Sequence, residues 1–207
     1  MGRRTRITRG PRPPGIPAGA SRANIGAVHA ESGFPPMKEE KDAPPVPFDI
    51  DPLPACGISR VLGLLETLDD RGGRERVGHL ARDLHIEFGE LLSVVKAAEM
   101  LGLVDTPGTD VVLQPAGKRT MELPMNEKKR AIREKIRVLP LFAAIETLLR
   151  RQEDPQLPKD VVLEELAVWL PDENPETMFK TIVNWGRYAE LFAYDADEER
   201  LSLDQGE

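Results

Sequence analysis

The feature that most constrains the fold of this 207-residue chain is a pattern that occurs twice after residue 53. In each copy, three stretches carry apolar residues at the 3.6-residue spacing of an amphipathic helix, and two short β-type runs follow. The pattern predicts a mainly α protein made of two tandem winged-helix modules, each with three helices and a two-stranded wing. We place the modules at residues 53–122 and 123–207.

In the first copy, Gly102 follows the third stripe, where a left-handed residue commonly ends a helix. The β-type runs 103–104 and 111–113 flank a Thr-Pro-Gly-Thr-Asp turn, which is typical of a hairpin. The residues expected to face the core are Ile58, Val61, Leu62, Leu65 and Leu68, then Val77, Leu80, Ala81 and Leu84, then Leu91, Val94, Val95, Ala98 and Leu101.

The second copy opens with a charged helix expected over residues 127–138. Pro140 either kinks this helix or begins a new one, since proline is tolerated in the first turn. Asn174 and Pro175 form an N-cap and N1 pair that begins the last helix. That helix turns Met178, Ile182 and Trp185 toward the core, and the runs 191–194 and 200–203 form the second wing.

Residues 1–52 are interpreted as a disordered tail and linker. Residues 1–55 hold 11 of the 19 prolines and no apolar periodicity, so they cannot offset an ordering cost of about 1–2 kcal/mol per residue. The first 22 residues hold six arginines and no acid, which leaves 22 basic and 35 acidic residues in the rest. This segment is interpreted as an extension upstream of a start at Met37, with a targeting segment or a nucleic-acid arm as alternatives.

No catalytic motif is visible. Gly117-Lys118-Arg119-Thr120 comes nearest to a phosphate-binding loop, but Val112 stands where its first glycine belongs, so we expect a solvated helix start. His79 and His85 are too far apart to share a helix face as metal ligands. The sequence therefore predicts a protein that is not an enzyme and that holds no cofactor and no metal.

The single cysteine, Cys56, has no basic neighbour and is expected to be a bystander. A chain with one cysteine is typical of a reducing compartment, which predicts a cytoplasmic protein. The longest apolar stretch, residues 138–145, is too short for the ~18 residues of a membrane span, so no direct membrane insertion is expected.

The segment 185–195 concentrates four of the ten aromatic residues. Trp, Tyr and Arg commonly anchor interfaces, because each buries a large area and keeps a polar group. For Trp185 and Phe192, core packing is the favoured interpretation. The candidate partner interface consists of Trp185, Arg187, Tyr188, Glu190 and Tyr194, with Asp70 and Arg71.

A DNA-binding alternative would use Lys180, Asn184 and Arg187, which fall at i, i+4 and i+7 of the last helix. Neutralisation of phosphates supplies most non-specific affinity for DNA. Here the stripe is surrounded by acidic residues, and the third helix of the first module exposes further glutamates, so DNA is disfavoured as a partner. The acids in question are Glu176, Glu190, Asp195, Asp197, Glu198 and Glu199, and in the first module Glu87, Glu90 and Glu99.

Two stretches, residues 64–73 (LLETLDDRGG) and 185–195 (WGRYAELFAYD), resemble the C-terminal AAA-associated domain of ABC-transporter ATPases of the nitrate/sulfonate/bicarbonate class. Residues 97–102 resemble the end of the same family's third helix, and the likeness runs from about residue 53 to 204. The resemblance implies an accessory or regulatory domain that follows a nucleotide-binding domain.

The motifs of the ATPase core have no counterpart in this chain. The resemblance therefore implies a stand-alone accessory subunit, or a remnant of a larger ATPase. Its expected partner is the ATP-binding subunit of such an importer, at the inner face of the cell membrane. A homodimer is also compatible with the sequence.

Overall fold

The apolar stripes and turns of the first half produce six elements in a defined order. In the computed structural model, which describes residues 50–204, these are α1 (Ile58–Asp69), β1 (Arg74–Arg76), α2 (Val77–Asp83), α3 (Phe88–Met100), β2 (Val104–Asp105) and β3 (Asp110–Leu113). The tail predicted to be disordered lies outside the described residues, apart from residues 50–52.

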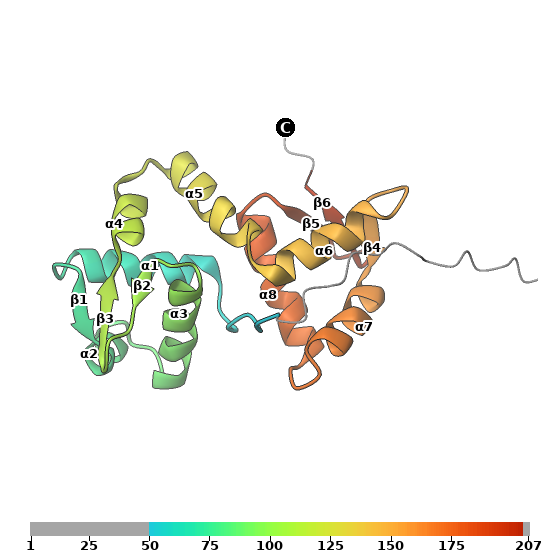
Figure 1. The fold of residues 1–207 in the computed structure, drawn as a ribbon. Helices are drawn as coiled ribbons and strands as arrows, with labels where there is room; N and C mark the ends of the chain where they lie inside the picture. The colour runs from blue at the N-terminus through green and yellow to red at the C-terminus, as the bar shows by residue number, and fades with distance from the viewer. Residues whose placement is uncertain (1–49, 205–207) are drawn as a thin grey trace, which may run out of the picture. The chain divides into compact units, whose positions relative to one another are not determined.

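Two further helices, α4 (Pro115–Glu122) and α5 (Met125–Arg137), lead to the second half (Figure 1). The second half repeats the order of the first, with α6 (Pro140–Arg150), β4 (Gln156–Pro158), α7 (Lys159–Trp169), α8 (Pro175–Tyr188), β5 (Phe192–Asp195) and β6 (Arg200–Leu203). Of the two alternatives for Pro140, the structure shows the new helix, with Leu139 as its N-cap.

Each half contains an antiparallel sheet of three strands, which corrects the expectation of two-stranded wings. The strand orders are β1-β3-β2 and β4-β6-β5. The missed strands are both at sheet edges, where β1 pairs Arg74 with Val112 and β4 pairs Leu157 with Leu201. Charged residues and proline are common in short edge strands, and neither gives the apolar alternation that identifies a strand in a sequence.

The predicted core stripes are confirmed except the second, in which Leu80 is buried and the other three residues are half-buried. All five residues of the third stripe, which covers α3 and its C-cap, are buried, and in α8 Met178, Ile182 and Trp185 are buried. In α1 the stripe is slightly rotated, since Leu64 is buried and Leu62 is only half-buried. Gly102 ends α3 with a φ of 62°, and the Asn174 side chain accepts a hydrogen bond from the Thr177 amide at 2.9 Å, as an N-cap does.

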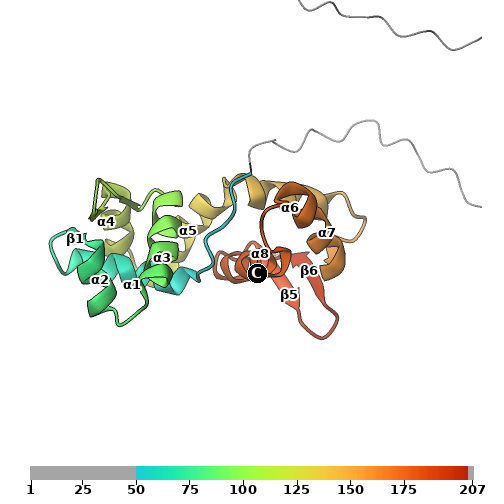
Figure 2. The same cartoon turned by 90° about the horizontal axis from the view of Figure 1, so that it is seen from below.

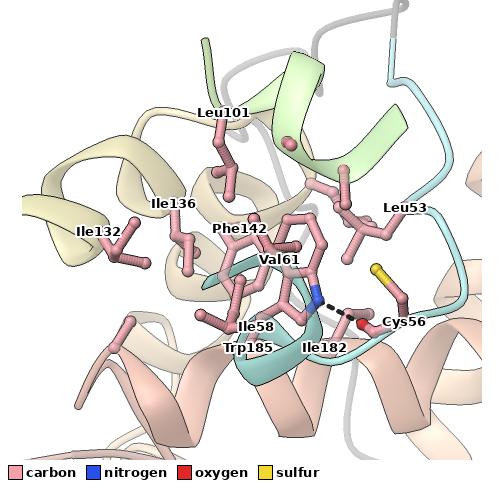
Figure 3. Close-up of a cluster of buried hydrophobic side chains, with 14 of the residues drawn as sticks. Leu53, Cys56, Ile58, Val61, Leu101, Ile132, Ile136, Phe142, Ile182 and Trp185 are labelled. Carbon is pink, nitrogen blue, oxygen red and sulfur yellow. Dashed lines mark hydrogen bonds between the residues drawn. The ribbon is translucent and has the colours of Figure 1, made fainter. Parts of the chain in front are cut away.

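The two halves share a core, and residues 50–204 belong to one compact unit. Trp185 of α8 donates a hydrogen bond from its indole Nε1 to the Cys56 carbonyl oxygen at 2.7 Å (Figure 3). Phe142 of α6 stacks on Trp185, with ring centroids 6.4 Å apart. Ile132 and Ile136 of α5 are buried in the same cluster, which therefore draws on residues far apart in the sequence.

Candidate functional site

The exposed face of α8 forms an open groove of about 430 Å³. Helical periodicity produces this face, because the opposite side of α8 is buried in the core. The groove is lined by Lys180, Val183, Asn184, Arg187 and Tyr188. The structure thus brings together the three residues of the DNA-binding alternative and two of the candidate partner interface.

The two cations of the α8 groove are available for a partner. Lys180 and Arg187 are exposed, and neither makes an ion pair with another residue of the described range 50–204. Asn184 is differently placed, since its Oδ1 accepts a hydrogen bond from the Ile58 amide at 3.3 Å. Through this contact, a side chain of α8 binds the first amide of α1. Because the contact uses one acceptor position of the amide oxygen, Asn184 is less available to a partner than Lys180 and Arg187 are.

Tyr188 adds an unusual polar group to the α8 groove. Its side chain is half-buried, and its hydroxyl is buried without a hydrogen-bond partner among the described residues. Burial raises the pKa of the Tyr188 phenol above its ordinary value, so the group stays protonated and remains a hydrogen-bond donor. A buried hydroxyl without a partner costs about 1–3 kcal/mol.

Trp185 does not belong to this surface: of its two interpretations from the sequence, the structure shows core packing, so it leaves the candidate interface. It is fully buried, and its one polar atom is used by the hydrogen bond to Cys56. The aromatic pattern that suggested an interface at this position is explained by the core. Tyr194 is half-buried and packs edge-on against Phe179, with centroids 5.2 Å apart.

Asp70 and Arg71 lie in the turn that joins α1 to β1, at the opposite end of the first half from α8 (Figures 1 and 2). Both residues are exposed. The Arg71 guanidinium is held locally, 2.6 Å from an Asp83 carboxylate oxygen and 3.2 Å from one of Glu75. The structure therefore does not bring this pair together with the α8 residues into one interface.

Sequence reasoning missed a second hollow surface, which lies along α5. We call it the α5 trough, and it consists of two adjoining pockets that both include Arg133. One pocket, of about 260 Å³, is lined by Lys129, Arg130, Arg133 and Glu190, and the other, of about 310 Å³, by Arg133, Arg137, Glu146 and Arg150. The sequence did contain a signal for this surface, since residues 118–151 hold ten basic and four acidic residues within an acidic chain.

Within residues 50–204, no group of three or more His, Cys, Asp or Glu side chains is arranged to hold a metal ion. No helix in the same range combines the length and apolarity required to cross a bilayer.

Cys56 is expected to react slowly with thiol reagents. Its side chain is buried, and burial raises the pKa of the Cys56 thiol to about 11, against a smaller opposing effect of Arg60. Only the thiolate reacts, so labelling with iodoacetamide at pH 8 is expected to be roughly a hundredfold slower than in the urea-unfolded chain. The folded-state rate is expected to rise with pH toward 11, and equal rates in the folded and unfolded chains would contradict the prediction.

No curated protein and no solved structure matches this chain. The family model of the C-terminal AAA-associated domain matches residues 78–195, from α2 to the end of β5 and more than half of the chain. The resembling stretches 97–102 and 185–195 lie inside this match, whereas 64–73 lies outside it. This chain belongs to the family of C-terminal AAA-associated domains.

Proposed function

We propose that this chain is a non-enzymatic accessory protein that binds an ATPase and modulates it. The more specific proposal is that the ATPase is the ATP-binding subunit of a nitrate/sulfonate/bicarbonate-type ABC importer, at the cytoplasmic face of the membrane. The family match over residues 78–195 carries this proposal, because an AAA-associated domain implies an ATPase as the kind of partner.

We also propose that each half is a winged-helix module. The repeated order helix, strand, helix, helix, strand, strand supports this proposal, as do the antiparallel sheets with the last strand in the centre. Winged-helix modules present a third helix with an exposed face, and in the second half that helix is α8.

The α8 groove is the proposed contact surface for the ATPase. Arg187 offers an exposed guanidinium without an ion pair in residues 50–204, and Tyr188 offers the accessible part of its half-buried ring. Arginine and tyrosine are enriched among the residues that carry most of the binding energy in interfaces. A carboxylate or carbonyl of the ATPase would pair with the Arg187 guanidinium, and the Tyr188 ring would add apolar contact area beside it.

Co-purification tests this proposal. The tagged chain, co-expressed with the ATP-binding subunit of an importer of this class, is expected to retain that subunit on an affinity column. The double variant Arg187→Ala/Tyr188→Ala is expected to lose about tenfold or more of the binding. Tyr188→Phe keeps the ring and is expected to weaken binding less, because only the hydroxyl is removed.

A matched control is Lys96→Ala/Lys118→Ala, which removes two exposed side chains without ion pairs in the described residues. This variant is expected to bind the ATPase as the unmodified chain does. Failure of the unmodified chain to retain any transporter subunit would overturn the proposed partner. Equal loss in both double variants would remove the α8 groove from the interface.

The DNA-binding alternative would use Lys180 and Arg187 in the same groove. The hydrogen bond from the Ile58 amide to Asn184 Oδ1 counts against it, because amide readout of a base uses that oxygen. A gel-shift series with genomic fragments at low salt is expected to show no binding at micromolar protein. A retarded band that is lost in Lys180→Gln/Arg187→Gln would favour a transcription regulator instead.

A further inference from the structure

The α5 trough has an excess of positive charge that its own carboxylates do not cancel. Its cations are Lys129, Arg130, Arg133, Arg137 and Arg150, and its carboxylates are Glu146, Glu190 and Asp204. Within the described range, residues outside 118–151 hold ten basic and 25 acidic residues, so the trough is a basic surface on an acidic protein.

The carboxylates of the trough hold some of the cations in place. Glu146, whose side chain is only 19% exposed, receives Nε and Nη2 of Arg150 at 3.0 and 2.6 Å on its Oε1. The same oxygen lies 3.6 Å from Nη2 of Arg137. Glu190 accepts a hydrogen bond from the Lys129 ammonium at 3.3 Å. These contacts hold the long side chains at the two ends of the trough. Less side-chain entropy is therefore lost when a ligand binds.

Arg130 and Arg133 lie between these fixed ends. Neither makes an ion pair with any residue in 50–204. Arg130 is exposed and Arg133 is half-buried, and Arg133 borders both pockets. The two guanidiniums are therefore the positions in the trough where an incoming anion gains most, since no carboxylate of the described residues has to be displaced.

The trough also has an apolar floor. Leu191 and Phe192 line the larger pocket and are 8% and 2% exposed, and the half-buried Leu203 lines it as well. The amide of Asp204 donates to the Leu191 carbonyl at 2.9 Å, which ties this floor to the end of β6. Cations at the rim and aliphatic groups on the floor match a chain in which acidic and apolar side chains alternate.

We propose that the α5 trough binds an extended acidic segment of the ATPase partner. Carboxylates of that segment pair with Arg130 and Arg133, and an apolar side chain between them lies against Leu191 and Leu203. This inference rests on the proposed function, and it assigns a second contact surface beside the α8 groove.

An acidic peptide fits the trough better than a nucleic acid or a membrane does. Single-stranded nucleic acids are bound by exposed aromatic side chains on which bases stack, whereas Phe192, the aromatic residue of the larger pocket, is 2% exposed. A flat bilayer surface does not enter a hollow, whereas single carboxylates on a peptide reach individual guanidiniums.

Fluorescence anisotropy with the full chain tests the proposal. The probe is a fluorescein-labelled peptide of alternating glutamate and leucine, about ten residues long and so about 33–36 Å when extended. It is expected to bind, and Arg130→Gln/Arg133→Gln is expected to raise its Kd by about tenfold or more. The control Lys96→Gln/Lys118→Gln removes the same charge outside the trough and is expected to leave the Kd within about twofold.

Three further measurements make the outcome decisive. A peptide of alternating glutamine and leucine is expected not to bind, and equal binding of both peptides would overturn the charge argument. Oligothymidine or phosphatidylserine vesicles bound more tightly than the acidic peptide, with the same loss in Arg130→Gln/Arg133→Gln, would replace the proposed ligand. Far-UV circular dichroism is expected to show equal helix content in both double variants.

The failure of this inference is distinguishable from that of the proposed function. If the unmodified chain retains no ATPase subunit yet binds the acidic peptide through Arg130 and Arg133, the partner is wrong and the peptide-binding trough stands without that partner. If the ATPase is retained equally by the unmodified chain and by Arg130→Gln/Arg133→Gln, and the peptide also binds both equally, the trough is overturned and the proposed function stands.

Discussion

Trp185→Ala is expected to lower the free energy of unfolding by about 4 kcal/mol, the range found when a buried tryptophan is reduced to alanine. The indole is fully buried in the cluster that joins the two halves, and it stacks with Phe142. The substitution leaves a large cavity and also removes the hydrogen bond from Nε1 to the Cys56 carbonyl. Small domains are stable by only about 5–15 kcal/mol, so this loss removes a large share of the protein's stability.

Urea denaturation followed by circular dichroism measures this effect. Trp185→Phe is the matched variant, because it keeps an aromatic ring in the core and removes the hydrogen bond. We expect it to cost about 1–2 kcal/mol, consistent with a smaller ring and one lost hydrogen bond. A loss below about 1 kcal/mol for Trp185→Ala would show that the shared core contributes little to stability.

Gly117→Ala is expected to destabilise the chain by about 3 kcal/mol, the upper end of the usual range for overpacking. A Cβ at this position in α4 would overlap the Leu103 carbonyl oxygen and lie 2.8 Å from Cδ1 of Leu113. The Leu103 carbonyl cannot move away cheaply, because Leu103 is fully buried and its oxygen accepts the Gln114 amide at 2.9 Å. The glycine is required by this close approach of α4 to the first sheet.

Gly63→Ala is the matched control for Gly117→Ala. Gly63 lies within α1, and a Cβ there would meet nothing within 4 Å. Alanine is favoured over glycine inside a helix, so Gly63→Ala is expected to raise the free energy of unfolding by about 0.5–1 kcal/mol. Thermal denaturation of the two variants side by side checks the pair, and a stable Gly117→Ala variant would contradict the packing described for α4.

The sequence sufficed for elements whose formation is governed by local chemistry. The stripe Leu91–Val94–Val95 predicts α3 because an apolar face must be buried, and Asn174 predicts the start of α8 because its side chain satisfies an end amide. Gly102 ends α3 for an equally local reason, since glycine adopts a positive φ without strain.

Elements that depend on distant partners were not predictable in this way. The strand Arg74–Arg76 forms because β3 offers a free edge, and its charged residues give no strand signal of their own. The sequence predicted that Trp185 faces the core, but not its hydrogen bond, because the acceptor is the carbonyl of a residue 129 positions earlier. The α5 trough combines α5 with Leu191 and Leu203, which no local pattern relates to each other.

The central position of β6 affects how this polypeptide should be shortened for expression. A fragment cut at Gly78 and Asp195, the limits of the family match, would lack β6, the strand that pairs with both β4 and β5. It would also lack α1, which provides five buried side chains and whose first amide is held by Asn184. The residues matched by the family model are therefore fewer than the residues that the fold needs, and a truncation series should retain residues 50–204.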